Sequence, residues 1–292
     1  MTLAATRPRS PARDAWRRLR TNRMAVICGG LFVAIVVACL VGPAICAAFG
    51  LDATTLDLDL LAAPPSRAHP LGTDALGRDL LVRVLVGGRI AILISLTATG
   101  VAIVIGVAWG AIAAYAGGRV DYVMMRIVDT LYGFPTIVFV VVIRAVFDTQ
   151  SLVSLFALIG AISWLTMARI VRGQVLTLRH REFVEAARAL GARPTRILFR
   201  HIVPNTLGAV IVYATVLVPQ TMLVEAFLSF IGLGVQAPLA SWGTLVTEGA
   251  TQIAVSPWVL VGPGVAMGLT IFALNFLGDG LRDALDPQSR RL

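Results

Sequence analysis

The stretch Ile90–Ala116 reads IAILISLTATGVAIVIGVAWGAIAAYA and contains no charged residue. About 20 apolar residues suffice for a helix to cross a bilayer, and this run is longer. The whole chain has the same character: 57% of its 292 residues are hydrophobic, 14% are charged, and the mean hydropathy is +0.83. Soluble domains carry about 25% charged residues. We therefore predict an all-α polytopic membrane protein and exclude a soluble enzyme, a disordered chain and a secreted disulfide scaffold.

Apolar runs predict six transmembrane helices. The first run follows a basic head, as in a signal peptide, but it is about 25 residues long, whereas the apolar part of a signal peptide has about 7–15. We therefore interpret it as a span. The expected spans are Met24–Ala48, Ile90–Ala116, Ile127–Phe147, Leu152–Ala168, Thr206–Val224 and Pro257–Leu277.

The distribution of arginine predicts the topology. All 25 basic residues are Arg and the net charge is +9, an excess that in so apolar a chain indicates cytoplasmic segments rather than nucleic-acid binding. Seven Arg lie in the N-terminal tail 1–23 and eight in the loop 169–205. We expect both termini to be cytoplasmic. Beyond the tail, the membrane domain 24–292 then has these segments: external loops 49–88 and 226–256, cytoplasmic loop 169–205 and cytoplasmic tail 278–292.

Residues 226–247 have two interpretations. They carry no charge and are long enough for a seventh span, but that span would place the C-terminal arginines outside. It would also place glycines and Pro238 in lipid, where irregular backbone requires shielding by protein. We expect a loop instead, and the sequence leaves open whether it is re-entrant or external.

The basic loop 169–205 contains a predicted short helix, about Arg181–Leu190. Its apolar residues recur at i, i+3, i+4 and i+7, which places them on one stripe. They are Phe183, Ala186, Ala187 and Leu190. The loop has little other chain to cover this stripe, so the pattern predicts a protein partner, with a helix lying on lipid as the alternative.

The ends of this loop also follow from sequence. Gly191 is suited to end the helix in the left-handed conformation. Pro204 disfavours helix at the residue before it, so we expect the loop to persist up to the fifth span.

The stretch 185–191, EAARALG, followed by HIVP at 201–204, resembles the coupling-loop signature of ABC importer permeases. Ten residues separate Gly191 from Ile202, and this longer spacing resembles the dipeptide/oligopeptide/nickel branch. Further stretches resemble the second, C-type permease of that branch and cover nearly the whole chain in order. They are WRRLRTNR at 16–23, HPLGTDALGRD at 69–79, EAFLSFIGLGVQ at 225–236, SWG at 241–243 and GDGLRDALDP at 278–287.

The resemblance implies a type I ABC importer permease in a bacterial plasma membrane. This subunit would form half of a translocation path beside a second, B-type permease. Two ATPase subunits, or one fused ATPase, would hold ATP and Mg, and an extracytoplasmic binding protein would deliver di- or oligopeptides, with nickel or haem as alternative substrates. The coupling helix would contact the ATPases through Phe183, Glu185, Ala186, Ala187, Leu190 and Gly191.

Two near-copies, LGTD at 71–74 and LGRD at 76–79, mark the first external loop. Gly and Asp suit turns and helix caps, so one interpretation is that they only shape the loop. The functional alternative is a docking surface for the binding protein. Its candidate residues are Asp74, Arg78, Asp79 and, from the last external loop, Trp242.

Charges within spans are costly and mark functional candidates. Asp129, Arg144 and Glu225 are therefore candidates for the translocation path. We expect Asp129 to pair with Arg126 or be hydrated, Arg144 to pair with Asp148, and Glu225 to form a packing ion pair or meet a peptide amine. Prolines in the spans are expected to kink them: Pro135, Pro219 and Pro263.

Motifs of catalysis and metal binding are missing from the sequence. The chain has no Lys, so it lacks the lysine of an ATP-binding P-loop, and we expect no enzyme activity and no cofactor in this subunit. The cysteines Cys28, Cys39 and Cys46 share a helix face but are too far apart for one metal ion. The competing class is an ion-gradient-driven transporter, which typically has an internal repeat and midplane carboxylates; neither is evident.

Overall fold

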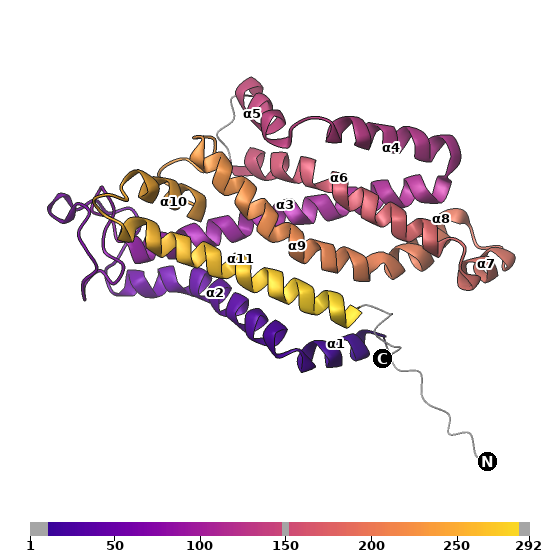
Figure 1. Ribbon diagram of the computed structural model, residues 1–292, viewed down its shortest axis with the longest axis horizontal. Coiled ribbons are helices and arrows are strands. Elements are labelled where there is room, and N and C mark those ends of the chain that lie inside the picture. The colour runs from indigo at the N-terminus through magenta and orange to yellow at the C-terminus, as the bar shows by residue number, and fades with distance from the viewer. Residues whose placement is uncertain (1–10, 148–151, 286–292) are drawn as a thin grey trace, which may run out of the picture.

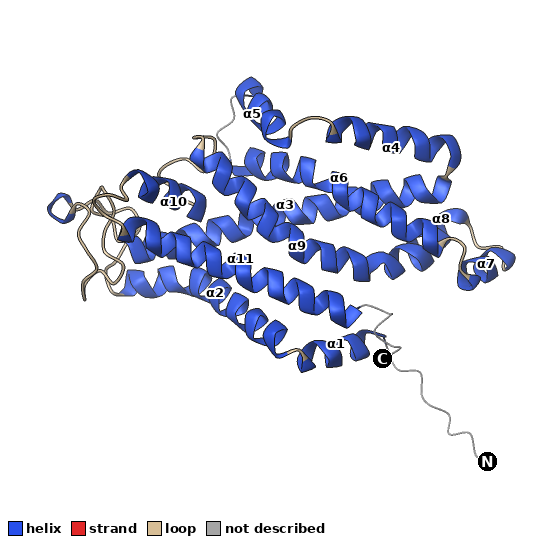
Figure 2. Ribbon diagram, in the orientation of Figure 1, coloured by secondary structure: helices blue, strands red, loops and turns tan. Residues whose placement is uncertain are grey.

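The computed structural model describes residues 11–147 and 152–285. These residues form helices joined by loops, with no β-strand among them (Figure 2). The elements are α1 (Pro11–Thr21), α2 (Arg23–Ala48), the 3-10 helix η1 (Leu58–Leu60), α3 (Leu80–Ala116), α4 (Gly118–Tyr132), α5 (Thr136–Phe147), α6 (Leu152–Leu178), α7 (Glu182–Ala189), α8 (Pro194–Arg196), the π-helical segment η2 (Ile197–Ile202), α9 (Val203–Phe230), α10 (Trp242–Thr251) and α11 (Trp258–Leu285).

The long helices lie side by side, with α3 against α6, α9 and α2, and α11 against α2 and α9 (Figure 1). Small residues bring α3 and α6 close together. A Cβ atom added at Gly110 would lie 2.3 Å from the Ala168 carbonyl oxygen, and one at Gly106 would lie 2.6 Å from the Met167 Cβ. Such small-residue contacts are typical of helices that pack within membranes.

Four helices in the described part of the chain are long and apolar enough to cross a membrane: α2, α3, α11 and the continuous run Pro194–Phe230. A fifth results if α4 and α5 are counted as one span, with a bend of 83° between them. The predicted span Ile127–Phe147 is therefore divided between two helices, and the break lies at Pro135, where a kink was expected. The chain breaks at residues 133–135, and α4 begins at Gly118, nine residues before the predicted start of the span.

The first external loop is shorter than predicted, because α3 begins at Leu80 rather than near residue 90. Asp79 caps the helix: its Oδ1 accepts a hydrogen bond from the Val82 amide at 2.9 Å. The apolar pattern missed this start because Arg83 and Arg89 interrupt the first turns of the helix.

The loop 169–205 is also shorter than predicted. α6 continues to Leu178 and α9 starts at Val203, which has helical φ and ψ of −55° and −44°. The expectation that Pro204 keeps its neighbour out of the helix is wrong. Pro204 lies in the first turn of α9, directly after the π-helical segment η2, where the regular α-helical hydrogen-bond pattern is interrupted, so a residue without an amide N–H is tolerated there.

Residues 226–247 do not form a seventh span. Their first part extends α9 to Phe230, and their last part begins α10, a helix of 10 residues, which is about 15 Å long at 1.5 Å per residue. Trp242 and Leu245 of α10 are buried, and α10 packs against α9, α11 and α3. This short helix therefore lies against protein.

The two ends of the bundle differ. One end, called here the α7 end, holds α7, α1 and the C-terminal end of α11 (Figure 1). The opposite end, called the loop end, holds residues 49–79 and α10. At the α7 end, α1 is a short helix within the arginine-rich N-terminal tail, with Trp16 exposed. The three cysteines are free and buried along α2.

Candidate functional sites at the two ends of the bundle

Helix α7 is held to the molecule by its inner face. Val184 is 0% exposed and, with Ala187, packs into an apolar cluster that includes Ile197 and Ile202 of η2. The helix ends as predicted, because Gly191 has a φ of +76°, in the left-handed region that glycine adopts without strain.

The outer face of α7 is apolar and exposed. Leu190 is 88% exposed, and Phe183 and Ala186 are exposed beside it. Glu185 is also exposed in the first turn, where a carboxylate is favoured by the helix dipole. We call Phe183, Glu185, Ala186 and Leu190 the α7 surface.

The prediction that Ala187 belongs to the exposed stripe is wrong. Ala187 is buried, because it lies on the side of the stripe nearest to Val184 and its short side chain stays within the molecule. Val184, which anchors the helix, was not identified from the sequence. Its position three residues before Ala187 is the signal that would have found it, since both then lie on one face.

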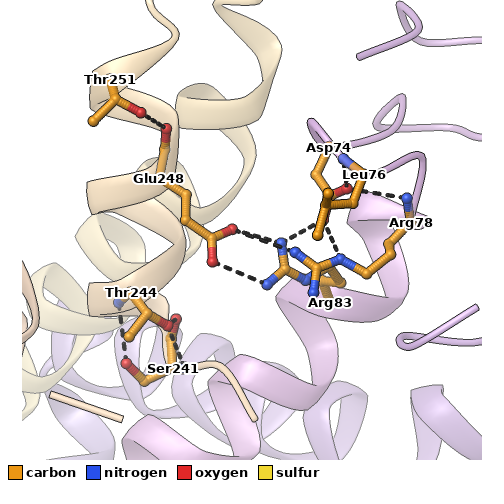
Figure 3. A network of polar contacts seen from close by, with 8 residues as sticks. All are labelled: Asp74, Leu76, Arg78, Arg83, Ser241, Thr244, Glu248 and Thr251. Atoms are coloured by element: carbon orange, nitrogen blue, oxygen red, sulfur yellow. Dashed lines mark hydrogen bonds and ion pairs between the residues drawn. The ribbon is translucent and has the colours of Figure 1, made fainter. Parts of the chain in front are cut away.

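At the loop end, Asp74 is the centre of a buried polar network (Figure 3). This side chain is 2% exposed, and its Oδ2 accepts hydrogen bonds from Arg78 Nε at 2.7 Å and from Arg83 Nη1 at 2.5 Å. Its Oδ1 accepts from the backbone amides of Leu76 at 2.8 Å and Arg78 at 3.0 Å. The carboxylate is thus saturated with donors, as burial of a charge requires.

Arg83 extends the network from α3 to α10. Its Nη1 donates to Glu248 Oε2 at 2.6 Å and its Nη2 donates to Glu248 Oε1 at 3.2 Å (Figure 3). The Arg83 side chain is buried, whereas that of Glu248 is 40% exposed. Sequence reasoning missed both residues, although Glu248 is the one charge in residues 226–256.

The structure does not support direct docking by the four candidate residues of the external loops. Asp74, Asp79 and Trp242 are buried, and Arg78 is turned toward Asp74. Asp79 Oδ2 lies 2.8 Å from His69 Nδ1, and Trp242 Nε1 donates to the Val84 carbonyl at 2.8 Å. These residues hold the loop, α3 and α10 together.

The charged candidates within the helices have internal partners. Asp129 Oδ1 accepts from Arg169 Nη2 at 2.8 Å, which joins α4 to α6. Of the two expectations for Asp129, pairing with Arg126 is not seen, since Arg126 donates to the Tyr122 hydroxyl, whereas hydration fits a side chain that is 52% exposed. Both members of the Asp129–Arg169 pair are largely exposed, so this pair contributes little to stability.

Arg144 and Glu225 are buried near the loop end of the bundle. Arg144 donates to the Leu233 carbonyl, and its predicted partner, Asp148, lies outside the described residues. Glu225 is 1% exposed, and its Oε1 accepts from Ser229 Oγ at 2.8 Å and Ser241 Oγ at 2.6 Å. The predicted ion pair of Glu225 is therefore replaced by hydrogen bonds from two hydroxyl groups, and the carboxylate is enclosed by protein in this structure.

No metal centre is present in residues 11–147 and 152–285, where no three His, Cys, Asp or Glu side chains lie close enough together to hold an ion.

Two known family models together match most of the chain. Residues 86–291 match the family described as binding-protein-dependent transport system inner membrane component, and residues 10–65 match the N-terminal TM domain of oligopeptide transport permease C. The oligopeptide transport system permease protein OppC of Escherichia coli (strain K12) is 47% identical, over 97% of this chain and 93% of its own. OppC of Haemophilus influenzae is 45% identical, over 97% and 90%. The dipeptide transport system permease protein DppC of Bacillus subtilis is 41% identical, over 97% and 87%.

Proposed function

This chain belongs to the family of binding-protein-dependent transport system inner membrane components, and we propose that it is the C-type permease subunit of an ATP-driven importer of di- or oligopeptides. The observation that carries this proposal is the similarity, along 97% of the chain, to permeases named for oligopeptide or dipeptide transport. The same names favour peptides over nickel or haem, and an ATP-driven importer over an ion-gradient-driven one. The subunit is a transport component that forms half of a translocation path.

The α7 surface is the proposed contact with the ATPase partners, which bind ATP and Mg. An exposed apolar side chain such as Leu190, next to the acidic Glu185, suits insertion of a short helix into an apolar cleft of another protein. The anchoring of the opposite face matters equally. Because Val184 packs into the cluster with η2, a push on α7 is transmitted to the start of α9.

The proposed partners are two ATPase subunits or one fused ATPase, a B-type permease and an extracytoplasmic binding protein, assembled in a bacterial plasma membrane. We place the α7 end in the cytoplasm with both termini. The two most arginine-rich segments, 1–23 and 169–205, support this orientation, since their described parts lie at that end (Figure 1).

Reconstitution tests the proposal. The complex in proteoliposomes should take up peptide only with ATP, its ATPases and the binding protein. Glu185→Lys reverses the charge on the α7 surface and should reduce uptake at least ~10-fold, the rate equivalent of about 1.4 kcal/mol, while the subunits still assemble. Thr177→Ala, an exposed change on the preceding helix, is the matched control and should retain uptake.

The two parts of the proposal fail separately. Uptake that persists after removal of the ATPases would overturn the assignment as an ATP-driven importer. Uptake at the wild-type rate in Glu185→Lys would overturn only the coupling role of α7.

A further inference from the structure

Two cavities lie along α9, and a single side chain lines both of them. The smaller, about 160 Å³, is bordered by α4, α6 and α9, and the larger, about 510 Å³, by α6, α9 and α11. Tyr213 is the one described residue that lines both. The smaller cavity extends from Tyr213 toward the loop end, and the larger extends toward the α7 end, where Asn205 lies.

The residues that line these cavities follow one face of each helix. On α9 they form one stripe of helical spacing: Asn205, Gly208, Ala209, Val212, Tyr213, Val216, Leu217, Gln220, Thr221 and Val224. At 1.5 Å per residue, Asn205 to Val224 covers about 28 Å. The hydrocarbon core of a bilayer is about 30 Å thick, so this face extends over the depth of a membrane.

The facing side of α6 supplies matching polar groups. Ser163 and Thr166 line the smaller cavity and Gln174 lines the larger. The Thr166 hydroxyl is hydrogen-bonded to that of Tyr132, across from Tyr213 in the same cavity. We call Ser163, Thr166, Gln174, Asn205, Tyr213 and Gln220 the α6–α9 seam.

The seam carries hydrogen-bonding groups but no charge. The charged residues that line the larger cavity, Asp279 and Arg282, belong to α11. The other side of α9 is apolar: Leu207 and Ile211 near the start of the helix are exposed, as contact with lipid requires, whereas Val218 and Met222 further along the same side are buried against protein. Polar side chains at membrane depth face water or protein rather than lipid. One side of α9 is therefore suited to water, and the other is suited to lipid at Leu207 and Ile211 and to packing against protein beyond them.

Resting on the proposed function, we propose that the α6–α9 seam is the wall that this subunit contributes to the peptide path, and that Tyr213 is the gate between its two halves. The ligand recognised is the peptide backbone. Uncharged amide and hydroxyl groups such as those of Gln220, Ser163 and Thr166 pair with backbone N–H and C=O groups whatever the peptide's sequence. The Tyr213 ring closes the way between the cavities, and its displacement joins them.

Cysteine accessibility tests the wall. The native cysteines are buried on α2, outside the seam, so the background carries Cys28→Ala, Cys39→Ala and Cys46→Ala and must first retain ATP-dependent uptake. Gln220→Cys probes a seam residue, and Val216→Cys probes the lining of the larger cavity about one turn away on the same face of α9. We refer to both as seam cysteines; Leu207→Cys and Ile211→Cys are matched controls on the same helix. A charged, membrane-impermeant thiol reagent is added to proteoliposomes of the assembled complex.

Seam cysteines should react at least ~10-fold faster than the controls, because the reactive thiolate forms in water and not in lipid. A transported dipeptide should slow the reaction at the seam only. Equal or slower reaction at Val216→Cys and Gln220→Cys would overturn the wall. If the wild-type complex imports peptide and the seam still does not react, this inference fails while the proposed function stands.

The gate has its own test. Tyr213→Ala should let a labelled dipeptide leak through proteoliposomes without ATP, at least ~10-fold above wild type, because removal of the ring joins the two cavities. Tyr213→Phe keeps the ring and should remain sealed. A leak in Tyr213→Ala equal to that of wild type would overturn the gate. If this variant does not assemble, the dipeptide leak is compared in Tyr213→Cys before and after reaction with the thiol reagent.

Discussion

The α7 surface and the Asp74 network show how similar sequence features lead to opposite structures. Both regions are short, contain glycine and charged residues, and were expected to contact other proteins. At the α7 end, Leu190 and Glu185 remain exposed, because the short loop provides no residues to cover them. At the loop end, Asp74 finds two arginines of its own chain and is buried. Whether a charge has an internal partner therefore decides whether its motif is available for docking.

The largest effect is expected from disrupting the buried Asp74 network. Asp74→Ala leaves Arg83 buried with part of its partners removed, and loss of one member of a buried ion pair costs about 3–5 kcal/mol. We expect the free energy of unfolding to fall by that amount, measured by denaturant unfolding in detergent. Asp59→Ala, an exposed change in the same loop, should leave it within about 0.5 kcal/mol. Equal effects of the two variants would contradict the network.

Ser241→Ala is expected to have the next largest effect on the free energy of unfolding. Ser241 caps α10 by accepting from the Thr244 amide, and its hydroxyl also donates to Glu225. Loss of a helix cap costs about 1 kcal/mol, and an unsatisfied buried group costs about 1–3 kcal/mol. The free energy of unfolding should therefore fall by about 2 kcal/mol. Thr251→Ala at the exposed end of α10 serves as control, and a change as large there would argue against a special role of Ser241.

Leu190→Asp probes the exposed side. It should leave the free energy of unfolding unchanged, since the side chain is 88% exposed, but should reduce peptide uptake at least ~10-fold, about 1.4 kcal/mol. Val184→Ala, on the buried inner face, should instead lower the free energy of unfolding by about 1–3 kcal/mol. Normal uptake with Leu190→Asp would show that the α7 surface is not a contact.

The smallest effect concerns the end of α7. Gly191→Ala forces a Cβ atom into the left-handed conformation, which costs about 1–2 kcal/mol, and no neighbouring atom adds a clash. Gly173→Ala is the matched control, because Gly173 lies within α6 with equally open space. There alanine should stabilise the helix by about 0.5–1 kcal/mol. The same sign of change in both variants would contradict the conformational explanation.

Much of the fold follows from local pattern. The apolar runs located α2, the apolar part of α3, α6, α9 and α11, because helix formation in lipid depends on length and hydropathy alone. The left-handed Gly191 also follows from local chemistry. Helix ends were less predictable: α3 starts ten residues before the apolar run, since Arg83 is neutralised by Asp74 and Glu248 rather than by water.

The candidate sites depended on contacts that no local pattern contains. The Arg83–Glu248 pair joins residues 165 positions apart, and only tertiary packing brings them together. The same holds for Glu225 and Ser241, which lie on different elements. The α6–α9 seam combines residues from helices whose polar positions appear isolated in the sequence. By contrast, the stripe on α7 was mostly visible, because its neighbours are within one turn of helix.

The length of α3 has a mechanical consequence. With 37 residues it is about 55 Å long, well beyond the roughly 30 Å of a hydrocarbon core. One end holds Arg83 in the network, and near the other the Ala114 carbonyl accepts from Arg179 Nη1 at 2.9 Å, just before α7 begins. A rod of this length is a lever: a tilt of about 5° displaces its far end by about 5 Å. A tilt of α3 imposed at the α7 end would therefore displace the end that packs against α10 by a distance comparable to the spacing between neighbouring side chains.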